Sequence, residues 1–158
     1  MLNDIKHKSE TISTYDVVET QFILKNAVIK KLKACSITPT QQRVEIAQIL
    51  FEKPQHLSAE QVLAKVNGHA AVSKATVYNT LGLFARKGLI REVIVDPSKV
   101  FYDSNIKKHH HFYNLDTGAL IDIDVSAVDL QTIPQLPIGT ETAGVDIIIR
   151  VRNTESTQ

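Results

Sequence analysis

Residues 72–93, VSKATVYNTLGLFARKGLIREV, carry the strongest structural signal in this chain. Ser73 can cap a helix, because its side-chain oxygen can accept hydrogen bonds from the free N–H groups of the first turn. Three apolar residues at helical spacing predict the face that packs inward, namely Val77, Leu81 and Phe84. Gly88 supplies a C-terminal stop, since glycine readily adopts the conformation that ends many helices. The pattern predicts a helix over residues 73–87, followed by a β-rich stretch.

Three patterns upstream predict further helices. Apolar residues at helical spacing over residues 26–35, with lysines on the remaining surface, predict a basic amphipathic helix. The segment TPTQ at 38–41 predicts a second helix, with Thr38 as the cap and its proline in the first helical position, which runs to about residue 52. The segment SAEQ is a capping box that opens a short third helix over residues 58–66. The helix at 73–87 follows these three.

Two β-rich segments follow Gly88. LIREVIV and KVFYD are separated by Asp96-Pro97-Ser98, where proline occupies the position that a type I turn favours, so they predict a hairpin. Closely connected helices followed by a two-stranded wing are typical of the winged helix-turn-helix, a DNA-binding fold. The predicted fold class is therefore α+β, in which an N-terminal winged helix-turn-helix domain precedes a small α/β dimerisation domain.

The remaining chain has the pattern of a sheet that needs a partner. HHHFYNLDTGALIDID predicts two strands around the turn at 116–118, and VDIIIRVR predicts a third, with a short helical turn near 126–131. So short a segment makes a poor core alone, so we expect a homodimer. The predicted domains are an N-terminal arm or extension (1–25), a winged-helix domain (26–104), a dimerisation and ligand-sensing domain (105–153) and a polar tail (154–158).

Charge is divided unevenly along the chain. The 108 residues before the histidine run carry 16 Lys+Arg against 10 Asp+Glu, and the rest carry 2 against 7. A basic part suited to phosphate thus precedes an acidic part. The single cysteine, Cys35, excludes an internal disulfide and a zinc site built from cysteine pairs; we interpret it as a small core residue. With no apolar run of about 20 residues, a cytoplasmic protein is expected.

The outward side of the 73–87 helix predicts a DNA-reading surface. Asparagine pairs with adenine through two hydrogen bonds, tyrosine bonds phosphate or contacts the thymine methyl, and lysine and threonine hold phosphate. Arginine from the preceding helix can grip the backbone nearby. The predicted DNA-binding residues are Arg43, Lys74, Thr76, Tyr78 and Asn79.

Three consecutive histidines, His109, His110 and His111, lie at the start of a predicted strand. Alternation along a strand sends His109 and His111 to one face and His110 to the other. Two imidazoles on one face form half of a metal site for zinc, iron, manganese or copper. Asp103 is a plausible further ligand, and folding could bring His56 close.

The segments HLSAEQVLAKV and VSKATVYNTLGLFARKGLIREV and the HHH run resemble the ferric uptake regulator (Fur) family over about residues 26–152. ATVYNTL, HHHFY, VDIIIRVR and the missing cysteine pairs look most like its iron response regulator (Irr) branch. The resemblance implies a transcriptional regulator, expected to be a repressor of iron or haem homeostasis genes. It also implies a homodimer that binds pseudo-palindromic, AT-rich double-stranded DNA and responds to a divalent metal or haem.

The resemblance also implies where the ligand binds. The family's regulatory site corresponds here to His56, Asp103, His109 and His111, with slack of one residue that could exchange His110 for a neighbour. In the Irr branch the run His109, His110 and His111 is implicated in binding haem. A second family site finds Asp129 here, but about Val145 stands where it needs a histidine, which leaves that site incomplete.

Two alternatives stay open beside this function. One is a winged-helix regulator with a purely structural metal site, and the other is a Fur-like sensor of zinc, manganese or peroxide. An enzyme is not expected, because the chain has no H-E-x-x-H motif, nucleophile elbow or phosphate-binding loop.

Overall fold

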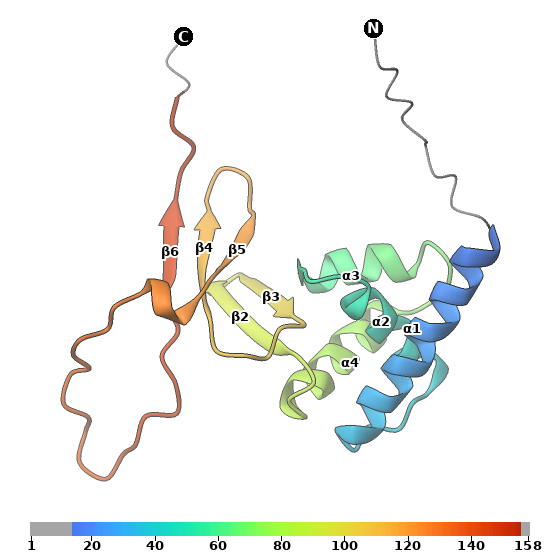
Figure 1. The fold of residues 1–158 in the computed structure, drawn as a ribbon, viewed down its shortest axis with the longest axis horizontal. Coiled ribbons are helices and arrows are strands. Elements are labelled where there is room, and N and C mark those ends of the chain that lie inside the picture. Colours follow the sequence, from blue (N-terminus) through green and yellow to red (C-terminus); the bar gives the residue numbers. More distant parts are fainter. Residues whose placement is uncertain (1–13, 156–158) are drawn as a thin grey trace, which may run out of the picture.

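The computed structural model describes residues 14–155. Its helices are α1 (Thr14–Ala34), α2 (Gln41–Phe51), α3 (Ala59–Val66) and α4 (Lys74–Arg86). Its strands, with one 3-10 turn, are β1 (His56–Leu57), β2 (Arg91–Asp96), β3 (Lys99–Asp103), β4 (His110–Asn114), β5 (Leu120–Ile123), η1 (Val125–Ala127) and β6 (Ile148–Val151). The four helices gather on one side of the molecule and the β4–β6 strands on the other, with β2 and β3 between them (Figure 1). The predicted α+β class is confirmed.

The helical part is held by one apolar core to which all four helices contribute. Leu32, Ile46, Leu50, Leu81 and Phe84 are at most 1% exposed. Burial of each such side chain contributes about 1.5–3 kcal/mol, which is the main force that assembles the helices.

The predicted ends of α3 and α4 agree with the structure. Ser58 and Gln61 form the reciprocal capping box of α3, and the Ser73 hydroxyl oxygen accepts a hydrogen bond from the Thr76 N–H at the start of α4. Gly88, with φ of 70°, follows α4 in the left-handed conformation that a side chain would disfavour.

The predicted cap of α2 is wrong by two residues. Thr40 is the cap, because its side chain accepts from the N–H of Arg43 and its carbonyl accepts the first helical bond from Val44. The carbonyl of Thr38 instead accepts from the Thr40 N–H and from Nη1 of Arg43. The arginine side chain therefore takes a position that a helical N–H would need to fill.

The predicted first helix begins too late. α1 starts at Thr14 and continues across the expected boundary at residue 26. Its N-terminal half exposes Val17, Val18, Phe22 and Ile23, so it has no buried face that would produce an amphipathic pattern. No proline or glycine interrupts this stretch, and Asp16 favours the positive end of the helix dipole. Residues 1–13 of the predicted arm lie outside the described residues, and the domain limits stay predictions.

Two three-stranded sheets follow the predicted hairpin patterns. The first has the order β1-β3-β2, in which the expected β2–β3 wing gains the short strand β1, which the sequence did not predict. The second has the order β5-β4-β6, with β4 antiparallel to β5 and parallel to β6. Val93, Val95 and Tyr113 form a small core between the sheets, with Ile148 packed against it. The wing is thereby attached to the C-terminal sheet.

Residues 128–147 form a long open segment before β6 (Figure 1). Only η1, residues 125–127, approximates the helical turn predicted near residues 126–131. Several apolar side chains of this segment are exposed, including Leu130, Ile133 and Ile138. Across residues 14–155, no helix combines the length and apolar character that crossing a bilayer requires.

Candidate functional site

Strand pairing in the first sheet brings two distant residues together. β1 places His56 directly opposite Asp103, the last residue of β3. Capping of α3 by Ser58 fixes the chain just after β1, so His56 is held at the junction between helices and sheet. Asp103 is 1% exposed, and a carboxylate so deeply buried requires charged or hydrogen-bonding partners.

The second sheet supplies three more side chains. His111 of β4 lies opposite Asp122 of β5, and His109 stands just before β4 on the same face as His111. His109 and His111 are 5% and 2% exposed. The expected alternation along the histidine run therefore positions both rings toward Asp103.

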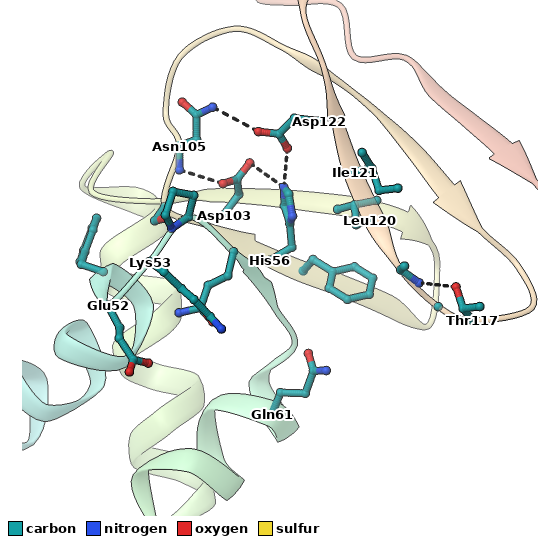
Figure 2. Close-up of a pocket in the computed structure, with 17 residues that line it drawn as sticks. Glu52, Lys53, His56, Gln61, Asp103, Asn105, Thr117, Leu120, Ile121 and Asp122 are labelled. Atoms are coloured by element: carbon teal, nitrogen blue, oxygen red, sulfur yellow. Dashed lines mark hydrogen bonds and ion pairs between the residues drawn. The ribbon is translucent and has the colours of Figure 1, made fainter. Parts of the chain in front are cut away.

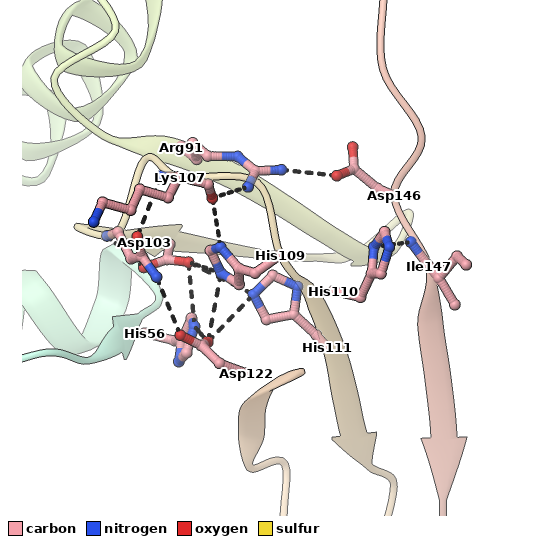
Figure 3. Close-up of polar contacts among 11 residues, drawn as sticks. His56, Arg91, Asp103, Lys107, His109, His110, His111, Asp122, Asp146 and Ile147 are labelled. Carbon is pink, nitrogen blue, oxygen red and sulfur yellow. Dashed lines mark hydrogen bonds and ion pairs between the residues drawn. The ribbon is translucent and has the colours of Figure 1, made fainter. Parts of the chain in front are cut away.

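Five side chains converge where the two parts of the molecule meet (Figure 3). One ligand atom from each lies within 4.8 Å of all the others, in a cluster of His56, Asp103, His109, His111 and Asp122. His56 Nε2 lies 2.8 Å from Asp122 Oδ1, and His109 Nε2 lies 2.8 Å from Asp103 Oδ2. His111 Nε2 is 3.5 Å from Asp103 Oδ2 and 3.6 Å from Asp122 Oδ1. We call these five residues the His/Asp cluster.

The His/Asp cluster fits a divalent metal ion. Ions such as zinc hold nitrogen and oxygen at about 2.0–2.2 Å, so ligand atoms around one ion stand about 3 to 4 Å apart. The ligand atoms of the cluster all lie within 4.8 Å of one another, so small side-chain adjustments would let one ion contact them. His56 Nε2 and His111 Nε2 are buried and face the carboxylate oxygens of Asp103 and Asp122, but among the described residues neither nitrogen forms a hydrogen bond of good geometry. Such atoms cost free energy unless they bind something. Three imidazoles and two carboxylates suit iron(II), manganese(II) or zinc.

The cluster also perturbs its own protonation. Burial alone would lower the pKa of His56, but Asp103 and Asp122 outweigh it and raise that pKa above 6.5. Burial would raise the pKa of Asp103, yet contacts with His111 and His56 and the N–H of Asn105 hold it well below its ordinary value. Asp103 therefore stays ionised, and a metal ion that binds His56 competes with the proton that its raised pKa favours.

Neighbouring groups orient the ligands. Asn105 donates its backbone N–H to Asp103 Oδ1 at 2.8 Å and its side-chain amide to Asp122 Oδ2 at 3.4 Å. Each carboxylate thus turns its other oxygen toward the histidines. The Lys107 carbonyl lies 2.6 Å from His109 Nδ1. Because a carbonyl only accepts, Nδ1 carries the proton and Nε2 faces the cluster.

His110 is separated from the cluster by the alternation of the strand. It is 6% exposed, and its Nδ1 accepts a hydrogen bond from the Ile147 N–H at 3.3 Å (Figure 3). Of the three consecutive histidines, His109 and His111 lie together with His56 in the structure. His110 instead connects β4 to the chain that enters β6.

A cavity of about 900 Å³ opens beside the cluster (Figure 2). His56, Asp103 and Asp122 line one wall, and Lys53 and the β4–β5 turn line others. The side chain of Asp122 is 43% exposed, whereas that of Asp103 is 2% exposed. The Asp122 side of the cluster is therefore accessible to an ion or small molecule from solvent.

The predicted DNA-binding residues occupy α4 and α2. Lys74, Tyr78 and Asn79 are exposed on the N-terminal half of α4. Thr76 is half-buried and its hydroxyl lies 2.9 Å from that of Ser73, so it completes the helix cap. Arg43 is half-buried through its bond to the Thr38 carbonyl. Three of the five side chains are thus directly accessible.

A carboxylate borders this surface. The Tyr78 hydroxyl donates a hydrogen bond to Glu60 of α3, which lowers the pKa of Glu60 and raises that of Tyr78. Lys74 Nζ lies 5.5 Å from the centre of the Tyr78 ring. Contact between this hydroxyl and phosphate would require it to leave Glu60.

Comparison with known proteins places the chain in a family. The profile of the Ferric uptake regulator family matches residues 35–141, which is most of the chain. The chain belongs to the ferric uptake regulator family. It is 32% identical over 109 residues to the ferric uptake regulation protein of Synechococcus elongatus, covering 66% of this chain and 69% of that protein. Members of this family are transcription regulators and not enzymes, which agrees with the expectation from the sequence.

Other relatives are named for different signals. The peroxide operon regulator of Bacillus subtilis is 28% identical over 102 residues, covering 64% of this chain and 70% of that protein. The ferric uptake regulator of Pseudomonas aeruginosa, in a structure with manganese, has a TM-score of 0.61 and 25% identity, covering 81% of this chain and 98% of that one. The coarse assignment to the family holds, whereas none of these names specifies the Irr branch.

Asp122 is the cluster residue that sequence reasoning missed. The turn at residues 116–118 was predicted, and antiparallel pairing around it places His111 opposite Asp122. Counting outward from the turn would have identified this carboxylate as the residue opposite His111. Asp129 of the incomplete second site is exposed and bonds Gln131 outside the cluster.

Proposed function

We propose that this chain is a homodimeric repressor of iron homeostasis genes, in which a divalent metal at the His/Asp cluster controls binding to operator DNA. One observation carries the proposal: His56 and Asp103 come from the helix-and-wing part, whereas His109, His111 and Asp122 come from the C-terminal sheet and the chain entering it. An ion bound by all five residues joins the two parts. Its occupancy then changes how the recognition helix α4 is presented.

The DNA half of the proposal rests on α4. In a helix-turn-helix, residues near the N-terminus of the recognition helix contact base edges in the major groove. Lys74, Tyr78 and Asn79 lie in this N-terminal part of α4. Two α4 helices in a symmetric dimer read two half-sites, so the operator is expected to be pseudo-palindromic. The family resemblance implies that it is also AT-rich. A protein with this partner is expected to act in the cytoplasm.

A divalent ion explains the histidine run better than haem does. His109 and His111 are turned into the cluster, and His110 is bonded to Ile147 on the opposite face. Haem bound by His109, His110 and His111 would have to break these contacts, because all three side chains are buried. An Irr-like response to haem is therefore the weaker form of the proposal, and iron(II), manganese(II) and zinc are its stronger ligands.

Peroxide sensing is a second candidate signal. Relatives named for a peroxide response match most of the chain, including the Bacillus subtilis regulator. The exposed side of Asp122 gives a small molecule access to the cluster from the cavity. In this version iron loading makes operator binding sensitive to peroxide, whereas manganese loading does not.

The function is tested by titrating the metal-free protein with Mn²⁺, Fe²⁺ without oxygen, Zn²⁺ or haem, and measuring operator affinity after each addition. We expect one or more divalent ions to change operator affinity by about 5–150-fold, the range of ordinary coupling between sites. Operator affinity identical in every arm would refute a sensor. Metal that raises only the melting temperature would indicate the purely structural site, and peroxide added to the iron arm distinguishes the second candidate.

The dimer is supported by an exposed apolar row across the second sheet. Ile121, Phe112 and Ile149 are paired across β5, β4 and β6, and their exposed fractions are 58%, 37% and 39%. This face points away from the wing, which Ile148 and Tyr113 contact from the other side. A contiguous apolar row of this kind marks an interaction site, and a second copy of the chain is the partner that a symmetric operator needs.

Phe112→Glu is expected to convert the dimer to monomers and to weaken operator binding, because a carboxylate would have to be buried at the centre of the interface. Sedimentation velocity and gel shift measure the two effects. Ile94→Glu is the matched control, since Ile94 is also exposed in a strand, at 60%, but lies on the wing. A Phe112→Glu protein that remains dimeric would exclude this face.

A further inference from the structure

Arg91 links the recognition helix to the His/Asp cluster. It is the first residue of β2, five positions after the end of α4, and the intervening Leu89 and Ile90 are buried in the helical core. Sheet pairing sets Arg91 directly opposite Asp103, which in turn lies opposite His56. Arg91 therefore shares a row of the sheet with two cluster residues while its backbone is anchored to α4.

The guanidinium group reaches two separate points of the C-terminal part (Figure 3). Arg91 Nη1 donates to the Lys107 carbonyl at 3.0 Å, and Nη2 donates to Asp146 Oδ1 at 2.7 Å. Arginine is suited to this arrangement because its donors form a fixed planar fork. The side chain is 24% exposed, although that of Asp146 is 68% exposed.

The first contact reaches a ligand directly. The Lys107 carbonyl that accepts from Arg91 is the same group that lies 2.6 Å from His109 Nδ1. Arg91 therefore holds the carbonyl that selects the tautomer and orientation of the His109 ring. Outer partners of this kind set the affinity of a metal site.

The second contact reaches β6. Asp146 precedes Ile147, whose N–H donates to His110 Nδ1 and whose carbonyl accepts from the His111 N–H at 3.0 Å. Arg91 thus contacts two segments. Lys107 belongs to the segment that precedes β4, and Asp146 belongs to the segment that precedes β6, the strand that pairs with β4. A shift of the histidine strand is transmitted to Arg91 at both points, and from there to the end of α4.

We infer that Arg91 is a positioning residue that orients the metal ligand His109 and couples metal occupancy to the DNA-reading helix α4. The inference rests on the proposed function, which supplies the metal and the operator. Because Asp146 is exposed, its ion pair with Arg91 contributes little to the stability of the fold. The role of Arg91 is therefore to connect the cluster to α4. Neither a metal ligand nor a DNA contact is required of Arg91 itself.

The test compares four variants of the 158-residue protein, each assembled as the dimer. Arg91→Met keeps the apolar stem and removes both donors, Arg91→Lys keeps the charge but loses the fork, and Asp146→Asn removes only the charge of the second contact. Arg152→Met is the matched control, because Arg152 faces Asp116 at 4.0 Å on the exposed surface, away from the cluster. For each protein, Mn²⁺ affinity is measured without DNA, and operator affinity is measured with chelator and with saturating Mn²⁺.

Arg91→Met is expected to bind Mn²⁺ about 10–100-fold more weakly, as other losses of an outer partner do. We call the operator affinity at saturating Mn²⁺ divided by the operator affinity in chelator the metal response. In Arg91→Met the metal response falls toward one, while the operator affinity in chelator stays at the wild-type value. Arg91→Lys keeps less than half of the wild-type metal response. Asp146→Asn keeps the wild-type Mn²⁺ affinity but loses part of the metal response, and Arg152→Met matches wild type in both.

The inference would be overturned if Arg91→Met bound Mn²⁺ as tightly as wild type and kept the wild-type metal response of its operator affinity. A wild-type protein whose operator affinity ignores metal would refute the proposed function instead, and the Mn²⁺ affinity of Arg91→Met would then decide the positioning role alone. Melting curves identify a misfolded Arg91→Met, in which case Asp146→Asn and Arg91→Lys decide: an unchanged metal response in both counts against the coupling.

Discussion

Asp103→Asn is expected to lower the affinity for Mn²⁺ by more than about 100-fold, since losing even an outer partner of a metal ligand costs about 10–100-fold. The neutral amide removes a buried charge that faces His56, His109 and His111 at 2.8 to 3.5 Å. It keeps the size of the side chain, so the pairing of β1 with β3 should persist. Titration calorimetry with Mn²⁺ measures the affinity, and operator binding by the variant should no longer respond to metal.

Asp129→Asn is the control for this loss. It removes the same charge from an exposed carboxylate that bonds only Gln131 among the described residues. Both variants carry the same change in net charge, so a nonspecific electrostatic effect would appear in each. Mn²⁺ binding by Asp103→Asn at wild-type strength would show that the cluster does not hold the metal.

The second large effect is expected at Asn79. Asn79→Ala should weaken specific operator binding by about 1–3 kcal/mol, or about 5–150-fold, because asparagine pairs with adenine through two hydrogen bonds. Asn79 is exposed on the N-terminal half of α4, and no other described residue bonds its side chain. Fluorescence anisotropy with operator and with scrambled DNA separates specific from nonspecific affinity, and only the first should fall.

Lys74→Ala is the comparison that distinguishes base reading from phosphate contact. Loss of a phosphate contact weakens binding to all sequences and reduces the salt slope by about one. Asn79→Ala should leave the salt slope unchanged. Equal losses on operator and scrambled DNA for Asn79→Ala would show that α4 does not present Asn79 to bases.

Much of the fold could be predicted because its signals are local. The caps at Ser58 and Ser73, the apolar stripe of α4 and the Asp96-Pro97-Ser98 turn depend on residues within a few positions of one another. A backbone N–H at a helix start needs an acceptor from the nearest side chain, so sequence alone indicates where α3 and α4 begin. The errors at α2 and α1 arose where such local signals were ambiguous or absent.

The candidate site divides along the same line. Alternation along a strand was enough to assign His109 and His111 to one face, because it requires no knowledge of the neighbouring strands. Asp103 and His56 were candidates from their residue types, and the family resemblance grouped them with the two histidines in one site. Tertiary structure alone decided that Asp122 joins them and that His110 bonds Ile147 instead. Strand register sets these contacts, and register depends on how whole sheets bury their apolar faces. Sequence therefore determined the local elements and their chemistry, whereas packing decided which of those groups meet.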